Sequence, residues 1–370
     1  GLVKYAKPAG VIASLIPMTN PAMTPPVTGV SSANARNAVI FSPHPRTAAT
    51  TFEMSRIMRA ACHAVGAPED IFQCIERPSI PMTQYLMESC DLTLATGGKP
   101  MVQAAYSSGK PAYGVGAGNS TIVVDETADL NEAAKNIMIS KTSDFGSGCS
   151  ADGNIVIQKS IYSNMVSQLK ANNGYLCNST QTKLLSRVMW DDKENRTFST
   201  IACRPQQLAL LAGFEIPENI KFLMVENNGK IGKEHKFSKE KLTTLMALYY
   251  FDDFPDALNI IQKIYEVGGK GHSCGIYSNS DKNIDALARV APVSRMMVRQ
   301  PQSKSNAGSW VNGMPMTSSL GCGIWGGNIT NENVTMKHMM NYTWVSRPIQ
   351  EDRPSEIELF GEFFGQEFAL

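Results

Sequence analysis

The sequence lacks the features that would place the chain in a membrane or on nucleic acid. No apolar run reaches the length that spans a bilayer, and no signal peptide is visible at the start. The formal net charge is only +1, which provides neither a basic surface for nucleic acid nor an attraction to an anionic membrane. We therefore expect no nucleic-acid partner and no membrane partner.

Paired and clustered cysteines are also absent. The eight cysteines are scattered along the chain, with no CxxC pair and no cysteine–histidine group at zinc spacing. In a chain of 370 residues this scatter indicates reduced thiols in the cytoplasm, not a disulfide framework. The sequence accordingly predicts no metal site.

What the chain does contain is an alternation of short apolar runs and amphipathic segments. The continuous run at 10–17 is typical of a strand that is buried on both faces of a parallel sheet. Further strands are predicted at 38–41, 91–95, 121–124, 155–158, 221–225, 245–251 and 341–349. The length exceeds that of one ordinary domain. Together these patterns predict an α/β protein of two lobes.

The glycine-rich segment 141–154 lies between the two halves and carries Cys149. Its glycines let backbone amides approach a ligand closely. A thiol in such a loop can be a nucleophile, with its own backbone N–H placed to meet an oxyanion. The alternative is a small buried residue, because free cysteine is among the most buried residue types.

Polar and glycine-rich loops follow three of the predicted strands in the first half. Asn20 follows the strand at 10–17, at the sheet edge where open α/β sheets bind ligands, although a turn before proline explains it equally well. His44 lies between two prolines, which suits either a rigid nucleotide contact or a plain turn. Thr96, Gly97 and Gly98 separate a strand from a helix, which favours phosphate or ribose binding.

The remaining candidates give weaker signals. The segment 114–119 is a poor dinucleotide fingerprint, because its third glycine is missing and a strand follows it. His272 comes after glycines at a strand start, which indicates either a close-approach site or a structural histidine. Glu240 is most simply a solvated acid. The segment 321–328, with Trp325, suits a planar ligand or a buried turn.

Taken together, the motifs resemble those of the CoA-acylating aldehyde dehydrogenases from about Gly10 to about Asn341. The motifs that carry the resemblance are IPMTNP, SPHPR, LATGG, GKPAYGVGAGN, DETADL, SKTSDFGSGCS, GGKGHS and LGCGIWGGN. The resemblance implies a Rossmann-like nucleotide-binding lobe at 1–140, an α/β catalytic lobe at 141–335, and an oligomerisation strand with a tail at 336–370. It also implies that an N-terminal part of the first lobe is missing, and that the partner is a second copy in a homodimer or higher homo-oligomer.

The resemblance assigns roles to particular residues. It implies that Cys149 is the nucleophile and that Asn20 stabilises the oxyanion, and it places His272 and Glu240 at catalytic motif positions without a defined role. The positions implied to bind the nicotinamide nucleotide are Ser42, His44, Pro45, Arg46, Thr96, Gly97, Gly98, Gly114, Gly116 and Trp325.

The implied reaction oxidises a small aldehyde with NAD or NADP through a Cys149 thioester, which CoA then accepts. CoA is favoured over water because Gly114 stands where hydrolytic members carry a glutamate. The segment 42–46 has no acid, and Arg46 could pair with a phosphate, so we expect NADP to be tolerated. Sulfoacetaldehyde is the favoured substrate from the motifs near the C-terminus, and succinate semialdehyde and acetaldehyde remain open.

Two other functions are compatible with the same motifs. One is an acyl-phosphate reductase of the same superfamily, which would ignore CoA. The other is a non-catalytic nucleotide-binding or assembly module, whose late strand adds to a partner's sheet. For the cellular location, the resemblance leaves a bacterial microcompartment open beside the cytoplasm.

Overall fold

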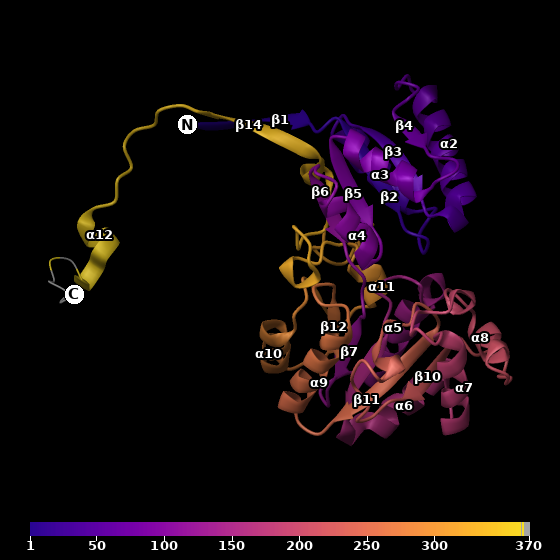
Figure 1. Ribbon diagram of the computed structural model, residues 1–370. Coiled ribbons are helices and arrows are strands. Elements are labelled where there is room, and N and C mark those ends of the chain that lie inside the picture. The colour runs from indigo at the N-terminus through magenta and orange to yellow at the C-terminus, as the bar shows by residue number, and fades with distance from the viewer. Residues whose placement is uncertain (364, 366–370) are drawn as a thin grey trace.

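The computed structural model describes residues 1–363 and 365, and it arranges them as two α/β lobes and a projecting arm (Figure 1). The α/β class predicted from the sequence is confirmed. Each lobe is built on its own parallel sheet, and helices cover both faces of each sheet. Among the described residues, no helix is both long and apolar enough to cross a bilayer.

The first lobe contains a five-stranded sheet in the order β4-β3-β2-β5-β6, with every neighbouring pair parallel. Its central strand alternates between two cores, because Ile12 and Ile16 face one helical layer while Ala13 and Leu15 face the other. Its strands are β2 (Val11–Ile16), β3 (Ala38–Pro43), β4 (Phe72–Cys74), β5 (Leu92–Thr96) and β6 (Ala112–Val115). Its helices are α1 (Thr24–Asn34), α2 (Ala48–Ala64), α3 (Ile80–Ser89) and α4 (Lys99–Tyr106).

The second lobe contains a seven-stranded sheet in the order β13-β12-β7-β8-β11-β10-β9, which is also parallel throughout. Its strands are β7 (Thr121–Val124), β8 (Asn154–Gln158), β9 (Gly174–Leu176), β10 (Phe222–Glu226), β11 (Leu245–Phe251), β12 (Cys274–Tyr277) and β13 (Met296–Val298). Its helices are α5 (Leu130–Thr142), α6 (Tyr162–Ala171), α7 (Ser179–Met189), α8 (Pro205–Leu211), α9 (Phe254–Val267), α10 (Asp281–Val290) and α11 (Gln302–Ser305).

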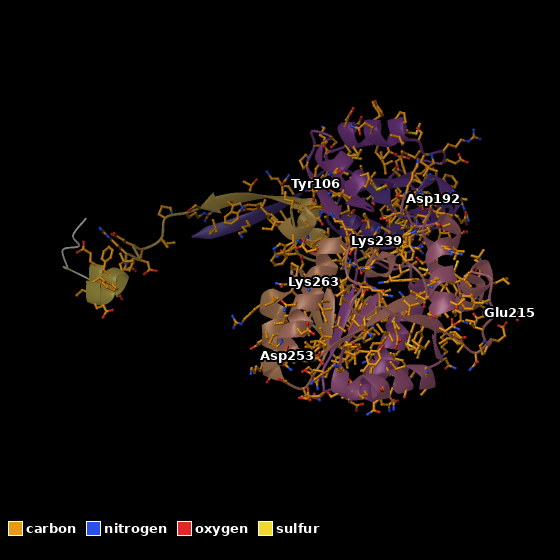
Figure 2. All side chains as sticks on the ribbon, turned by 60° about the horizontal axis from the view of Figure 1, so that its bottom comes forward. Tyr106, Asp192, Glu215, Lys239, Asp253 and Lys263 are labelled. Atoms are coloured by element: carbon orange, nitrogen blue, oxygen red, sulfur yellow. The ribbon has the colours of Figure 1, made fainter. Side chains whose placement is uncertain are left out.

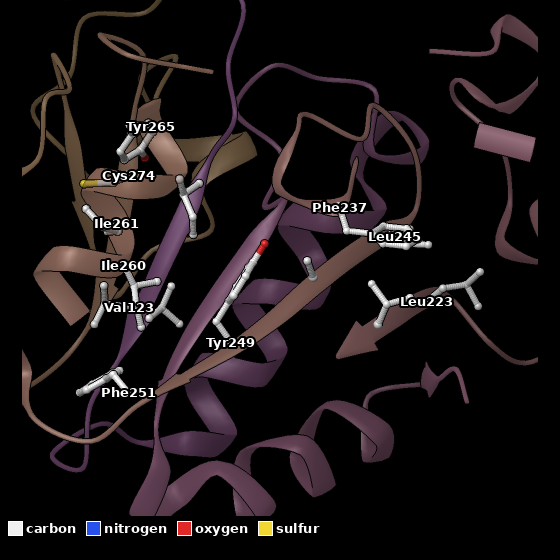
Figure 3. Close-up of a cluster of buried hydrophobic side chains, with 14 of the residues drawn as sticks. Val123, Leu223, Phe237, Leu245, Tyr249, Phe251, Ile260, Ile261, Tyr265 and Cys274 are labelled. Atoms are coloured by element: carbon white, nitrogen blue, oxygen red, sulfur yellow. The ribbon is translucent and has the colours of Figure 1, made fainter. Parts of the chain in front are cut away.

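The core of the second lobe has two layers, one on each face of the sheet. On one face, side chains of α7 to α10 pack against strand residues such as Val123 and Tyr249 (Figure 3). On the other face, α5 and α6 pack against Ile122 and Val124. Burial of both faces explains why these strands are almost continuously apolar in the sequence.

The boundary between the lobes differs from the one predicted at 140. Strand β7 pairs with β8 and β12 of the second sheet, so the chain leaves the first lobe between β6 and β7, at 116–120. The helix α5, which was predicted to close the first lobe, therefore belongs to the second. The difference arises because the alternation of strands and helices continues without interruption from one sheet to the next, and periodicity does not show which sheet a strand joins.

The arm is formed by the two ends of the chain. Strand β1 (Leu2–Pro8) pairs antiparallel with β14 (Met340–Ser346), and both project away from the lobes (Figure 1). The short helix α12 (Glu356–Phe360) lies beyond them and has no buried residue. The segment predicted as an oligomerisation strand and tail contains β14 and α12, and its residues 364 and 366–370 lie outside the described part.

Candidate active site

A cleft of about 320 Å³ lies between the two lobes. On one side it is lined by loops at the carboxyl ends of β2, β3, β5 and β6, as expected for an open parallel sheet. On the other side it is lined by the loop that carries Cys149 and by Glu240 and Leu242. Figure 2 labels Lys239, which directly precedes Glu240, between the lobes. Of the predicted site residues, those that line the cleft are Asn20, His44, Thr96, Gly97, Gly98, Gly116, Cys149 and Glu240.

The Cys149 thiol lies against the imidazole of His272. The distance from Cys149 Sγ to His272 Nε2 is 3.0 Å, and the other ring nitrogen, Nδ1, lies 2.9 Å from Ser273 Oγ. Cys149 is partly exposed to the cleft, whereas His272 is fully buried just before β12. A nucleophile with a base in hydrogen-bond reach and a third group behind the base is the arrangement of covalent catalysis.

The loop before Cys149 has an unusual backbone. Asp144, Phe145 and Gly146 all have positive φ, at 47°, 51° and 69°. Two of these are not glycine, so the loop holds a conformation that L side chains rarely adopt, as is found at functional sites. On its far side the loop packs tightly, because a Cβ added to Gly118 would lie 1.9 Å from the carbonyl oxygen of Cys149. Gly118, in the separate segment 114–119, therefore allows two pieces of backbone to meet behind Cys149.

Both members of the pair are neutral at neutral pH. Burial raises the pKa of the Cys149 thiol to about 12, and Glu240 and Cys322 raise it further than Arg295 lowers it. Burial, assisted by the cation of Arg295, lowers the pKa of His272 to about 3. A thiolate–imidazolium pair is consequently not the resting state.

The first lobe supplies groups that fit a nucleotide and an oxyanion. Helix α4 begins after Gly98, so its first backbone N–H groups point toward the cleft end where Thr96 and Gly97 also lie. Such a helix N-terminus suits a pyrophosphate. The Asn20 side-chain amide, which makes no hydrogen bond within the described residues, is available to donate to a ligand in the cleft.

Glu240 is a partly buried acid that lines the cleft, and not the solvated acid that its surrounding lysines suggest. Burial raises the pKa of its carboxyl to about 8, against the lowering by the Gly118 backbone N–H and by Lys141. Its Oε1 atom is inaccessible to solvent and has no hydrogen-bond partner among the described residues. An unpaired carboxyl oxygen beside a ligand cleft is placed to accept a hydrogen bond from a bound molecule.

Five of the predicted nucleotide contacts lie away from this cleft. Ser42 is buried against Thr83, with 2.9 Å between the two hydroxyl oxygens, and Gly114 is buried in β6. Trp325 is about half exposed and lines a second hollow, on which Gly116 also borders. These placements leave the assignments as predictions.

The same holds for Pro45 and Arg46, which are exposed after β3. The Arg46 guanidinium lies 3.7 Å from the ring centroid of Phe198 in the second lobe. It therefore bridges the two lobes, and its predicted pairing with a ribose phosphate also stays a prediction.

Sequence reasoning missed the polar residues behind His272. Ser273, Ser120, Gln302 and Asp152 are all buried, and hydrogen bonds join them in that order. Ser273 is the last residue of the motif GGKGHS, Asp152 lies within the segment 141–154, and Ser120 directly follows the motif GKPAYGVGAGN. Gln302 has no such signal, since it lies in the isolated helix α11.

Known proteins that are similar to this chain are aldehyde dehydrogenases. The profile of the aldehyde dehydrogenase family matches residues 2–176. A sulfoacetaldehyde dehydrogenase from an Acholeplasma species is 42% identical over 364 residues, which are 97% of this chain and 75% of that protein. A sulfoacetaldehyde dehydrogenase (acylating) from Bilophila wadsworthia is 39% identical, over 98% of this chain and 79% of that protein. The crystal structure of an acetylating aldehyde dehydrogenase from Geobacillus thermoglucosidasius matches with a TM-score of 0.92 at 36% identity, over 96% of this chain and 78% of that chain.

Proposed function

We propose that this chain, which belongs to the CoA-acylating branch of the aldehyde dehydrogenase family, oxidises a small aldehyde to an acyl-CoA with NAD or NADP. The observation that carries this proposal is the 3.0 Å contact between Cys149 Sγ and His272 Nε2 beside the interlobe cleft. The contact supplies a nucleophile together with the base that activates it.

The chain's own residues account for the acylation half of the reaction. His272 Nε2 takes the thiol proton as Cys149 Sγ attacks the aldehyde carbon. The oxyanion that forms is then held by the side-chain amide of Asn20 and by the backbone N–H of Cys149. The nicotinamide nucleotide, when bound, supplies the hydride acceptor and a positive charge beside the thiol. Loss of hydride from the tetrahedral adduct leaves a thioester on Cys149.

The acyl group then passes to the CoA thiol. Hydrolysis would need a base within reach of an attacking water. At Gly114 no side chain fits without movement, because an added Cβ would lie 2.4 Å from Val102 Cγ1 and 2.9 Å from the Tyr106 hydroxyl. The position that carries a base in hydrolytic members thus has no room for a side chain, which supports CoA as the acyl acceptor.

Sulfoacetaldehyde is the substrate that we propose. Two of the similar proteins are named for it, at 42% and 39% identity. We also propose that the exposed arm of β1 and β14 joins two copies of the chain, since a two-stranded ribbon alone is marginal in water.

The test is an assay of acyl-CoA formation by the purified protein with sulfoacetaldehyde, succinate semialdehyde and acetaldehyde. We expect acyl-CoA only when CoA and oxidised nucleotide are both present, with the highest kcat/KM for sulfoacetaldehyde. Cys149→Ala should lower kcat by roughly 10⁴-fold or more while nucleotide still binds. Appreciable turnover of pure Cys149→Ala would contradict the mechanism, whereas a better rate with another aldehyde would overturn only the substrate.

A further inference from the structure

Behind His272, an unbranched series of side-chain hydrogen bonds, or hydrogen-bond file, runs through the core of the second lobe. His272 Nδ1 lies 2.9 Å from Ser273 Oγ, which lies 3.2 Å from Ser120 Oγ. Ser120 Oγ lies 2.9 Å from Gln302 Oε1, and Gln302 Nε2 lies 3.0 Å from Asp152 Oδ1. All five side chains are buried, with exposed fractions of 0% or 1%. The file ends at the one carboxyl group that it contains.

That carboxyl group fixes the direction of every bond in the file. A carboxylate only accepts, so it must receive the N–H of Gln302, and the amide oxygen of Gln302 must then face Ser120. Ser120 donates its only hydroxyl proton to that amide oxygen, so it must accept a hydrogen bond from the hydroxyl of Ser273. Ser273 has then no proton left for His272, so it accepts from Nδ1–H.

We infer that Asp152, acting through Gln302, Ser120 and Ser273, holds His272 in the Nδ1–H tautomer and so presents the unprotonated Nε2 to the Cys149 thiol. These four are positioning residues, because none of them touches the thiol. The inference rests on the proposed function, in which His272 is the base for Cys149. The reverse tautomer would put a proton on Nε2 and leave the thiol without an acceptor.

The surroundings of the file favour this direction. Tyr265, which Figure 3 labels beside Cys274, donates its hydroxyl to the backbone carbonyl of Ser273 at 2.7 Å and holds that residue in place. Arg295 donates to the carbonyl of His272 at 3.1 Å, and its cation disfavours a doubly protonated ring. Burial raises the pKa of the Asp152 carboxyl to about 7, against the lowering by Ser140 and by the buried Lys141 of α5. The carboxylate, which sets the direction of these bonds, therefore predominates above that pH.

The first experiment replaces the carboxyl group without changing its shape. In Asp152→Asn, either the oxygen or the nitrogen of the new amide can face Gln302. The side-chain amide of Gln302 can then rotate by half a turn, which reverses the direction of every hydrogen bond in the file. We expect part of His272 to change to the Nε2–H tautomer, which ¹⁵N NMR of histidine-labelled protein distinguishes by the shifts of the two ring nitrogens. His272 is one of five histidines, so its signals can be assigned by their loss in His272→Gln.

The second readout is the reactivity of the thiol. With nicotinamide nucleotide bound, the alkylation rate of Cys149 by iodoacetamide should fall in Asp152→Asn by about 10- to 100-fold, the usual effect of losing an outer partner that orients a histidine. Nucleotide affinity should stay unchanged, because Asp152 does not line the cleft.

Ser120→Ala gives an independent test if Asp152→Asn does not fold. Without Ser120 the proton of Ser273 has no acceptor, so it can turn to Nδ1, and the same two changes are expected. The matched control is Ser278→Ala, which removes a buried 2.5 Å hydrogen bond to Asp125 at the other ends of β12 and β7. It should lower stability without altering the tautomer or the alkylation rate.

A folded Asp152→Asn and a folded Ser120→Ala that both keep the Nδ1–H tautomer and the wild-type alkylation rate would overturn the inference. That result would leave the proposed function intact, since the function is decided by acyl-CoA formation and by Cys149→Ala.

Discussion

The neutral state of Cys149 decides when the enzyme can react. A thiolate is the reactive form of cysteine, and with a pKa of about 12 the resting thiol forms almost none of it. His272, with a pKa of about 3, does not keep the proton either. The resting thiol should therefore react slowly with oxidants and alkylating agents.

Glu240 is the residue that most directly challenges CoA as the acyl acceptor. It lines the cleft with Cys149, and its raised pKa of about 8 would make it an effective base near that pH. Yet its carboxyl also receives the Gly118 backbone N–H, which fixes one end of the group. The reaction in the absence of CoA tests whether Glu240 can activate a water.

We predict that, without CoA, the enzyme releases about one reduced nicotinamide per active site and then stalls as an acyl-Cys149 thioester. Rapid-quench mass spectrometry of the intact protein should show the trapped acyl group, and added CoA should remove it as acyl-CoA. Glu240→Gln serves as the comparison, because Glu240 and Asp144 are the two carboxyl groups among the described residues that line the cleft. Steady release of free acid by the wild type, abolished in Glu240→Gln, would show that Glu240 is a hydrolytic base.

At the scale of elements, the sequence predicted what local patterns determine. Strands β7 and β11 were predicted at their observed bounds. The Cys149 loop was predicted between the halves, but it lies within the second lobe, between α5 and β8, and borders the interlobe cleft. Contacts between distant segments were not predictable, because Gln302 and Asp152 lie 150 residues apart and no local pattern links them.

The loops that support Cys149 depend on a close approach between backbones. At Gly118 even a methyl group would overlap the Cys149 carbonyl oxygen, at 1.9 Å, although the φ of Gly118 is not itself unusual. From the sequence, close approach of backbone to a ligand was predicted for the segment 141–154, and the segment 114–119 was described only as a poor dinucleotide fingerprint. In the structure, Gly118 of the second segment lets two pieces of backbone meet behind the nucleophile.

We predict that Gly118→Ala lowers kcat by about 100-fold, since a shift of about 1 Å in a reacting group has that effect. The fold should persist, and circular dichroism should match that of the wild type. Gly313→Ala is the control, because no atom lies within 4 Å of a Cβ added there. Unchanged kcat in Gly118→Ala would show that the Cys149 loop can move away without loss of geometry.

At the scale of the whole molecule, the site is assembled by the meeting of two sheets. The first lobe contributes the ends of its parallel strands, and the second contributes the nucleophile, its base and the file of hydrogen bonds behind it. The Arg46–Phe198 contact is one bridge between them, and it sits at the loop that follows β3. Both lobes therefore contribute residues to the lining of the cleft.

The arm exposes apolar surface that contact with a second copy of the chain would bury. Its strands bury no residue, and large apolar side chains remain open on it, with Tyr5 55% and Trp344 60% exposed. Only the cation of Lys4, 3.9 Å from the ring centroid of Trp344, covers part of that surface. Exposed apolar area of this kind, on a ribbon with open edges, marks an interaction surface.

We predict that the double variant Tyr5→Asp and Trp344→Asp shifts the protein from a homo-oligomer to a monomer, measured by sedimentation velocity. Charge on the arm should prevent it from packing against a second copy. The lobes should stay folded and bind nucleotide, because Tyr5 and Trp344 belong to none of the hydrophobic core clusters of the described residues. Val65→Asp, at the exposed end of α2 in the first lobe, adds a charge at an equally open site and should leave the oligomer intact. A wild type that sediments as a monomer, or a double variant that keeps the wild-type mass, would show that the arm does not join the copies.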